Sequence, residues 1–321
     1  MKVIIAYASA GAGHSKAAEA VYNRFREKHP GVTAISIDIL AQENCFFRYC
    51  YSHGYSFMVK YAPFLWQFGF WVCAWRPLRF LTRPIAKALN RLNTRNFAQF
   101  LIRESPDVII STHFLTSEIA AALKKRNRIN CRLITVITDF GVHPFWLSEG
   151  TDTYVAASEA TRHVLLAEGI EDGRIRVLGI PVDEKFLSPG DAAALCRKFG
   201  IQENKFTVLV ATGSFGIGPI ARIVASLQDV QVLVVCAKNK KLYRSLQEAA
   251  YPQARVFGFV DNIQELMAVS DIIITKPGGL STVESLSMGL FPIFIVPIPG
   301  QETENIRCLA EQGVGMYAKG I

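Results

Sequence analysis

Residues 271–286 run DIIITKPGGLSTVESL, and this stretch decides the fold class. Its first part, Asp271–Thr275, is a short apolar run rich in β-branched residues, which predicts a strand buried on both faces. Two glycines follow, and the spacing of Ser281–Met288 predicts a helix. A buried strand that passes through a glycine turn into a helix is the repeating unit of a parallel α/β sheet.

The same alternation of strand and helix extends in both directions from this stretch. An amphipathic helix is predicted at Lys16–Lys28. Ten further strands are predicted, at Lys2–Ala8, Val32–Ile39, Asp107–Ser111, Arg132–Thr138, Thr153–Ala156, Arg174–Leu178, Phe206–Ala211, Val230–Cys236, Arg255–Phe257 and Phe291–Val296.

One turn-rich stretch, beginning at Gly179–Asp183, interrupts the alternation before it restarts near residue 190. The predicted fold class is therefore α/β, with two doubly wound domains at residues 1–185 and 190–321. Sheets of this kind bind ligands at the carboxyl ends of their strands. We expect a cleft between two facing sheets, with the chemistry in the strand-to-helix loops.

Composition excludes several classes of protein. Half of the 321 residues are hydrophobic and 19% are charged, which excludes a disordered chain. The seven cysteines are odd in number and form no CxxC pair, so neither a metal site nor a disulfide framework is predicted. A reducing compartment, the cytoplasm, is the expected location.

Residues 44–103 hold nine Lys/Arg and no Asp or Glu, within a chain of net charge +8. Residues 44–80 also hold 14 of the 35 aromatic residues, including Trp66, Trp71 and Trp75. This combination favours an anionic membrane surface over nucleic acid. Lys60, Pro63 and Gln67 interrupt the most apolar part, so an interfacial segment is predicted rather than a transmembrane span. A buried helical pair is the alternative.

The first candidate loop follows the first strand and contains Gly11-Ala12-Gly13-His14. It is not a P-loop, and Lys16 stands where a dinucleotide fingerprint needs a small residue. Asp38, at the end of the second strand, keeps a dinucleotide site open as an alternative. At the top of a strand, His14 can act as a general base near neutral pH, or it can cap its own helix.

A second loop follows the fourth strand and places Asp139 four residues before His143. This pair suits acid–base chemistry, and the alternative is an N-cap with a surface histidine. His113 follows the third strand, and we expect it to be structural.

Glycine-rich turns in the second half suit a phosphorylated ligand. Gly213-Ser214-Phe215-Gly216 lets the backbone approach a phosphate, although a flexible connector is the alternative. The helix start at Gly278-Gly279-Leu280-Ser281 can receive a phosphate, and Glu284, one turn further, can bind a ribose diol. Amide and carboxylate side chains cluster between Pro297 and Asn305, and such side chains suit a hydroxyl-rich ligand. No Asp-x-Asp motif occurs, so no metal or other cofactor is expected.

Several of these motifs together resemble the motifs of a known family, the monogalactosyldiacylglycerol synthases and bacterial processive diacylglycerol glucosyltransferases. These enzymes are relatives of the MurG glycosyltransferase. The resemblance covers the chain from Lys2 to about Gly315. The motifs that carry it are Gly11-Ala12-Gly13-His14, Thr138-Asp139-Phe140 with His143 and Trp146, Lys276–Leu286, and Pro299-Gly300-Gln301-Glu302.

The resemblance implies a GT-B fold of two facing Rossmann-like domains. It implies a metal-independent, inverting transfer of a hexose from a UDP-sugar to a diacylglycerol-type lipid. The N-terminal domain would bind the lipid acceptor and the C-terminal domain the UDP-sugar. The protein would be cytoplasmic and peripherally bound to the membrane.

By motif, the resemblance assigns the catalytic histidine to His14, and Asp139 would then orient it. The donor residues fall on Gly213–Gly216 for the phosphates, Phe259 and Val260 for the uracil, Glu284 for the ribose, and Gln301 and Glu302 for the sugar. Two other functions stay open. One is a MurG-like transfer of N-acetylglucosamine to a polyprenyl-linked acceptor, and the other is a non-catalytic nucleotide-sugar or lipid-binding protein.

Members of this family run some tens of residues beyond a segment like Gln312–Ile321, and end in helices that return to the first domain. The resemblance therefore predicts that the chain is a fragment or a shortened member.

Overall fold

A computed structural model describes residues 1–9, 11–188 and 190–320, without the side chains of Tyr55, Ser56 and Lys60. Ala10 in the first glycine loop and the predicted interruption at Lys60 therefore lie outside what is described. The chain forms two compact units. Unit 1 contains Met1–Val182 and Ile298–Glu304, and unit 2 contains Asp183–Pro297 and Asn305–Ile321. The boundary lies a few residues before the predicted one, and a short segment near residue 300 belongs to unit 1.

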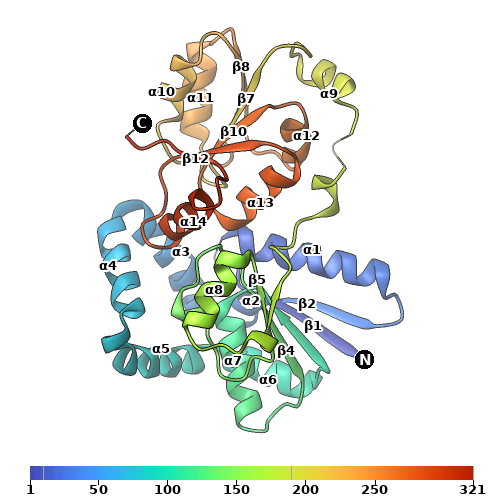
Figure 1. The fold of residues 1–321 in the computed structure, drawn as a ribbon, viewed down its shortest axis with the longest axis vertical. Helices are drawn as coiled ribbons and strands as arrows, with labels where there is room; N and C mark the ends of the chain where they lie inside the picture. The colour runs from blue at the N-terminus through green and yellow to red at the C-terminus, as the bar shows by residue number, and fades with distance from the viewer. Residues whose placement is uncertain (10, 189, 321) are drawn as a thin grey trace. The chain divides into compact units, whose positions relative to one another are not determined.

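Unit 1 is built on a parallel six-stranded sheet in the order β2-β1-β3-β4-β5-β6 (Figure 1). Ile5 of β1 pairs with Ser36 of β2 and with Ile110 of β3. The strands are β1 (Lys2–Tyr7), β2 (Thr33–Asp38), β3 (Val108–Ser111), β4 (Arg132–Val136), β5 (Thr153–Ala156) and β6 (Ile175–Val177). The helices beside them are α1 (Ala12–Lys28), α2 (Ile39–Gln42), α6 (Arg95–Glu104), α7 (Phe114–Lys125), α8 (Glu159–Ala167), η2 (Pro144–Trp146) and η3 (Asp172–Arg174).

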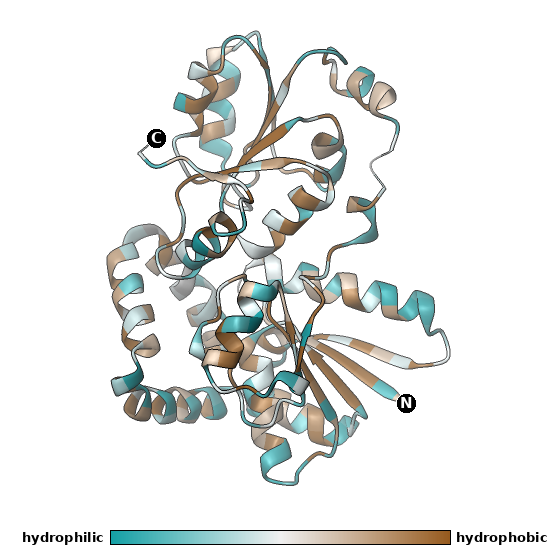
Figure 2. Cartoon of the chain, viewed as in Figure 1, coloured by the Kyte–Doolittle hydropathy of each residue, from teal (hydrophilic) through white to brown (hydrophobic). Residues whose placement is uncertain are grey.

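Helices on both faces explain why the strands are apolar throughout. Ile4 of β1 packs with α6 and α7 on one face of the sheet, through Leu101 and Leu115. Ile5, the next residue, packs with Ala18 of α1 on the other face. Because successive strand residues point to opposite faces, both sets must be hydrophobic. Figure 2 shows the strands of both sheets as largely hydrophobic.

Four consecutive elements in residues 45–93 lie to one side of this sheet (Figure 1), and Phe47 and Tyr51 at their start pack against its core. They are α3 (Cys45–Tyr61), α4 (Pro63–Ala74), η1 (Arg76–Leu78) and α5 (Arg79–Asn93). Helix α4 contains no buried residue, so the alternative of a buried helical pair in residues 44–80 is wrong for this helix. The rings of Trp71 in α4 and of Trp75, its C-cap residue, stack with their centroids 5.3 Å apart. Within the described part of the chain, no helix has the length and apolar composition needed to cross a bilayer.

Unit 2 has a second parallel six-stranded sheet, in the order β12-β11-β10-β7-β8-β9. Val208 and Val210 of β7 pack with α10 and α11 on one face, and Leu209 packs with α12 on the other. The strands are β7 (Thr207–Ala211), β8 (Gln231–Val235), β9 (Ala254–Phe257), β10 (Ile272–Thr275), β11 (Phe291–Phe294) and β12 (Met316–Tyr317). The helices are η4 (Glu184–Phe186), α9 (Ala192–Phe199), α10 (Ile220–Ser226), α11 (Lys240–Ala249), α12 (Ile263–Ala268), α13 (Gly279–Ser287) and α14 (Gln301–Ala310), whose first four residues belong to unit 1.

The predicted fold class of two doubly wound α/β domains is confirmed, and each predicted strand occurs. The start of α1 was misplaced, because the helix begins at Ala12 and His14 lies in its first turn rather than in a loop. Its N-cap is Gly11, at φ 129°, which has no side chain to mark a helix start. Helix α13 likewise begins at Gly279, two residues before the predicted start.

Candidate active site

The sheet of unit 1 reverses its strand order between β1 and β3, because β2 lies on one side of β1 and β3 on the other. Ligands bind doubly wound sheets at the carboxyl end of such a switch point. His14 follows β1, Thr112 follows β3, and Thr138 follows the adjacent β4. Residues that follow three separate strands therefore meet at one sheet edge.

The ring of His14 is held at its Nδ1 atom. This atom lies 2.9 Å from the carbonyl oxygen of Thr112 and 2.8 Å from the hydroxyl oxygen of Thr138. The hydroxyl of Thr112 donates in return to the carbonyl oxygen of His14, at 2.9 Å. A carbonyl oxygen only accepts, so Nδ1 carries the proton and Nε2 keeps its lone pair in the neutral ring. Nε2 is therefore the atom that can accept a proton.

The surroundings of His14 favour its neutral form. Burial lowers the pKa of His14 below its ordinary 6.5, and this outweighs the charge of Asp139 and the bond to Thr112, which both raise it. Asp139 is itself buried, and within unit 1 its carboxylate accepts from Nε2 of Gln301 at 3.0 and 3.2 Å. The negative charge favours an imidazolium once a proton has been transferred to His14. The arrangement is that of a neutral base beside a carboxylate.

His113 is structural, as the sequence indicated. Its side chain is buried at the N-cap of α7, where Nδ1 accepts from the backbone N–H of Leu115 at 3.1 Å. Its ring meets that of His14 edge-on, with centroids 4.6 Å apart. Burial and the proximity of His14 hold the pKa of His113 well below 6.5. The neutral ring of His113 therefore packs edge-on against one side of the His14 ring.

His143, the third predicted catalytic residue, uses both ring nitrogens to join backbone segments. Nε2–H donates to the carbonyl oxygen of Phe70 in α4 at 3.2 Å, and Nδ1 accepts from the N–H of Phe145 at 3.3 Å. Burial lowers the pKa of His143 to about 4. Because neither nitrogen keeps a lone pair for a substrate, this geometry favours a structural role over that of a base.

The predicted sugar-contacting pair lies in the segment Ile298–Glu304 of unit 1. Gln301 binds Asp139, whereas the carboxylate of Glu302 accepts from the N–H of Ile298 at 2.6 Å, in the turn before α14. This segment packs tightly, since a Cβ on Gly300 would meet the ring of Phe70 at 2.6 Å. Gln301 thus connects this segment to Asp139, one of the predicted catalytic residues.

The sheet of unit 2 also has a switch point, between β7 and β10. The loop Gly213–Gly216 follows β7, with Gly213 at φ 79° and Gly216 at φ 54°. A Cβ on Gly216 would lie 2.5 Å from the carbonyl oxygen of Cys236, and the carbonyl of Gly216 accepts from Nδ2 of Asn239 at 3.0 Å. The loop is therefore anchored rather than a flexible connector.

The other predicted donor-binding residues follow β9 and β10. Gly278 is the N-cap of α13, so the N–H groups of Gly279, Leu280 and Ser281 occupy a first turn that leaves such groups without partners inside the helix. Glu284 is half-buried in the next turn.

Phe259 is 69% exposed, beside half-buried Val260. The sequence predicted that the side chain of Asn305 contacts the ligand, and its observed contact is different. It is fully buried and its Nδ2 donates to the carbonyl oxygen of Pro277 at 2.9 Å, which fixes the turn before α13.

Sequence reasoning did not single out Thr112 and Phe70. Both act through backbone carbonyl oxygens, which leave no signature in residue type. The position of Thr112 directly after a predicted strand was the available signal. Among the described residues, no group of three or more His, Cys, Asp or Glu side chains is arranged to hold a metal ion, and metal independence stays a prediction.

Comparison with known proteins gives two family matches. The monogalactosyldiacylglycerol (MGDG) synthase family matches residues 14–182, and the glycosyltransferase family 28 C-terminal domain matches residues 207–320. The processive diacylglycerol beta-glucosyltransferase of Staphylococcus aureus (strain MRSA252) is 28% identical over 327 residues, which cover 99% of this chain and 81% of that protein.

Solved structures share the fold. MurG of Acinetobacter baumannii has a TM-score of 0.56 at 15% identity and covers 99% of this chain and 85% of its own. The UDP-GlcNAc 2-epimerase of Neisseria meningitidis, bound to UDP-GlcNAc, has a TM-score of 0.58 at 15% identity and covers 98% and 87%. These likenesses show the expected GT-B type of fold.

Proposed function

The chain belongs to the monogalactosyldiacylglycerol synthase family, and we propose that it is an inverting glycosyltransferase that moves a hexose from a UDP-sugar to a diacylglycerol-type lipid. The match of its second half to a glycosyltransferase C-terminal domain supports a nucleotide-sugar donor. The Staphylococcus aureus relative, a processive diacylglycerol beta-glucosyltransferase, supports the lipid acceptor.

The observation that carries the proposal is the state of His14. Its Nδ1 proton is committed to Thr112, its pKa is lowered, and Nε2 is free to accept a proton. In the proposed reaction Nε2 takes the proton of the acceptor hydroxyl while that oxygen bonds to the anomeric carbon. The bond from this carbon to the UDP oxygen breaks, and its electron pair leaves with UDP. Attack opposite the leaving group inverts the anomeric centre, and Asp139 stabilises the imidazolium that forms.

Unit 2 is proposed to bind the donor. The first-turn N–H groups of α13 and the anchored loop Gly213–Gly216 supply positive partial charge for the pyrophosphate, which needs stabilising as UDP leaves. Glu284 would accept from the ribose hydroxyls, and exposed Phe259 with Val260 would contact the uracil. Gln301 and Glu302 are proposed for the sugar. No metal, cofactor or nucleic acid is required in this scheme.

The acceptor is insoluble in water, so we propose that the enzyme binds peripherally to the cytoplasmic face of the membrane. Residues 44–103 support this, because they combine nine Lys/Arg with exposed rings on α4. Charge and aromatic rings are the two usual terms of interfacial binding.

The proposal is tested by incubating the full chain with diacylglycerol liposomes and separately with UDP-glucose, UDP-galactose and UDP-N-acetylglucosamine, followed by mass spectrometry of the lipids. A hexosyl-diacylglycerol that also forms in EDTA is the expected product. Absence of a glycosylated diacylglycerol with all three donors would overturn the acceptor assignment. Complete, reversible loss of activity in EDTA would overturn metal independence. Release of UDP without lipid product separates donor hydrolysis from transfer.

A further inference from the structure

The loop that carries Asp139 is anchored on both sides of this residue. On one side, the hydroxyl oxygen of Thr138 lies 2.8 Å from Nδ1 of His14. On the other side, the carbonyl oxygen of Phe140 accepts from the hydroxyl of Thr161 in α8 at 2.8 Å. Contacts with two other elements thus fix the backbone around Asp139.

The segment Gly300–Glu304, which also belongs to unit 1, packs directly against this loop. A Cβ on Gly141 would lie 2.6 Å from the Cβ of Glu304, so any larger residue at Gly141 would push the segment away. At the same contact, Nε2 of Gln301 donates to both carboxylate oxygens of Asp139, at 3.0 and 3.2 Å. The close approach of the two backbones therefore sets the contact between the two side chains.

The turn at the start of this segment is held by its own side chain and by α4. The N–H of Gly300 donates to the hydroxyl oxygen of Thr303 at 2.8 Å, and that hydroxyl donates to the carbonyl oxygen of Gly300 at 3.2 Å. A Cβ on Gly300 would lie 2.6 Å from the ring of Phe70 in α4. Gln301 is thus held in position by packing as well as by its hydrogen bond.

The orientation of the buried Asp139 carboxylate matters for the base. Its charge raises the pKa of His14 against the effect of burial, and it stabilises the imidazolium only while it stays beside the ring. A buried carboxylate needs hydrogen-bond donors, and the amide of Gln301 supplies one. Because a carboxylate only accepts, the amide nitrogen must face Asp139, which leaves Oε1 of Gln301 as the atom for a sugar hydroxyl.

We propose that Gln301 is a positioning residue that holds the Asp139 carboxylate beside His14. The packing of Gly141 against Glu304 determines whether Gln301 can reach that carboxylate. This inference rests on the proposed function, because it assigns Gln301 to the catalytic pair in addition to the sugar. It implies that a change of packing at Gly141 slows the reaction.

The test is steady-state kinetics of the full chain with diacylglycerol micelles and a UDP-sugar, beside calorimetry with UDP. The Cβ added in Gly141→Ala should separate the segment from the loop and leave the affinity for UDP unchanged. It should lower kcat by about 10²-fold, the cost of roughly 1 Å of misplacement at an active site. Glu304→Gly removes the atom that the new Cβ would meet, so Gly141→Ala should not lower kcat further in that background.

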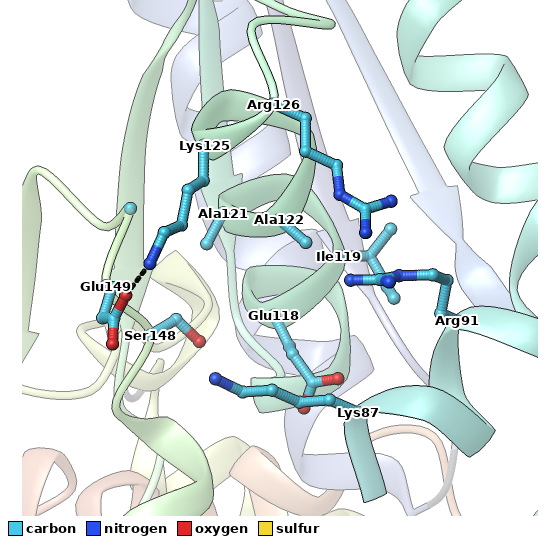
Figure 3. Close-up of a pocket in the computed structure, with 11 residues that line it drawn as sticks. Lys87, Arg91, Glu118, Ile119, Ala121, Ala122, Lys125, Arg126, Ser148 and Glu149 are labelled. Carbon is cyan, nitrogen blue, oxygen red and sulfur yellow. Dashed lines mark hydrogen bonds and ion pairs between the residues drawn. The ribbon is translucent and has the colours of Figure 1, made fainter. Parts of the chain in front are cut away.

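The matched control is Gly150→Ala. A Cβ on Gly150 would lie 2.9 Å from the backbone of Ala121, so this variant also disturbs the packing of unit 1. Gly150 lines a cavity of about 200 Å³ between α5 and α7 (Figure 3), and none of the described residues around it belongs to the Asp139 loop or to Gly300–Glu304. The control should lower stability in urea unfolding without changing kcat.

The titration of His14, followed by NMR and assigned with His14→Ala, gives a readout without turnover. Asp139 and His113 are the titratable groups that interact with His14. Once released from Gln301, the Asp139 carboxylate can turn to water, which screens its charge at the ring. The midpoint of His14 should therefore fall in Gly141→Ala and stay unchanged in the control.

A second variant covers the case that Gly141→Ala does not fold. Thr303→Val, at an exposed position, removes the hydroxyl that holds the Gly300 turn and should lower kcat by about threefold to tenfold, whereas Thr303→Ser keeps the hydroxyl and the wild-type kcat.

The outcomes separate this inference from the proposed function. Wild-type kcat or an unchanged His14 midpoint in Gly141→Ala, an equal fall of kcat in Gly150→Ala, or wild-type kcat in Thr303→Val would each overturn the inference. A wild-type chain that transfers no sugar would contradict the proposed function, while the His14 midpoint would still decide whether the packing at Gly141 acts on the catalytic pair.

Discussion

Nδ1 of His14 lies 2.9 Å from the carbonyl oxygen of Thr112, across two neighbouring connections of the unit 1 sheet. The contact fixes which ring nitrogen holds the proton, and so leaves Nε2 as the basic atom. The backbone that follows β3 thereby prepares the side chain of His14, in the first turn of α1, for proton transfer.

Replacing His14 tests this role directly. His14→Ala should lower kcat by about 10²–10⁴, the usual contribution of a general base, while the affinity for UDP stays unchanged. His163→Ala removes an exposed histidine of α8 in the same unit and serves as the control. Steady-state kinetics and calorimetry with UDP measure the two quantities. Wild-type turnover in His14→Ala would show that His14 is not the general base, and Asp139 would be the next candidate.

The pH profile should follow the ionisation of His14. Only the neutral ring can accept a proton, and its pKa is lowered from 6.5, so the acid limb of kcat/KM should have its midpoint below pH 6.5. Asp139→Asn removes a charge that raises this pKa, and should move the midpoint further down and lower the rate at neutral pH. Asp229→Asn, at an exposed position of unit 2, is the control. A midpoint that does not move in Asp139→Asn contradicts the electrostatic role.

The strands were predictable because a sheet covered on both faces demands unbroken apolar runs, as in Val3–Ala6. The start of α1 was not, because Gly11 gives no capping signal. The two-residue strand β12 was missed, since both its residues are exposed and show no apolar pattern.

The site was predictable only in part. The spacing identified His14 and Asp139, but the contact between Asp139 and Gln301 joins positions 162 residues apart. Similarly, the apolar spacing within α5 indicates an amphipathic helix, but it cannot show that the side chains of Leu81, Ile85, Leu89 and Leu92 are exposed. Tertiary packing decides that direction.

His143 should make stability depend on pH. Its pKa is about 4 in the folded protein and 6.5 when exposed, so unfolding takes up a proton between these values. The contribution of His143 to the free energy of unfolding is therefore fully present above pH 6.5. It is lost as the pH falls toward 4, by up to about 3 kcal/mol. His143→Gln cannot titrate and should show a shallower fall in urea unfolding measured across that window. Identical pH slopes in the two proteins contradict the assignment.

Glu284 should contribute to the affinity for UDP. A carboxylate that accepts hydrogen bonds from a ribose is worth about 1.5–3 kcal/mol for each bond, so Glu284→Ala should weaken UDP by at least about tenfold. Glu248→Ala removes an exposed carboxylate of α11 in the same unit and should have no effect. Calorimetry with UDP compares them. Unchanged affinity in Glu284→Ala would mean that the ribose binds elsewhere.

Membrane binding by residues 44–103 should have two separable terms. The nine Lys/Arg of this segment include Arg76 and Arg79, which pair with Glu168, and Arg103, which pairs with Glu104. The other cations give an electrostatic attraction of on the order of 1 kcal/mol each at an anionic surface, which salt screens. Trp71 and Trp75, which are 53% and 46% exposed and stack on each other at the end of α4, supply a term that salt does not remove.

Cosedimentation with anionic liposomes over a salt series should therefore show binding that weakens but persists. Trp71→Ser with Trp75→Ser should abolish most of the salt-resistant part without unfolding the protein, because both rings are exposed. Phe206→Ser removes an exposed ring of unit 2 and should leave both terms intact. A protein that stays in the supernatant at low salt, or a double variant that unfolds in circular dichroism, would show that α4 is not a membrane anchor.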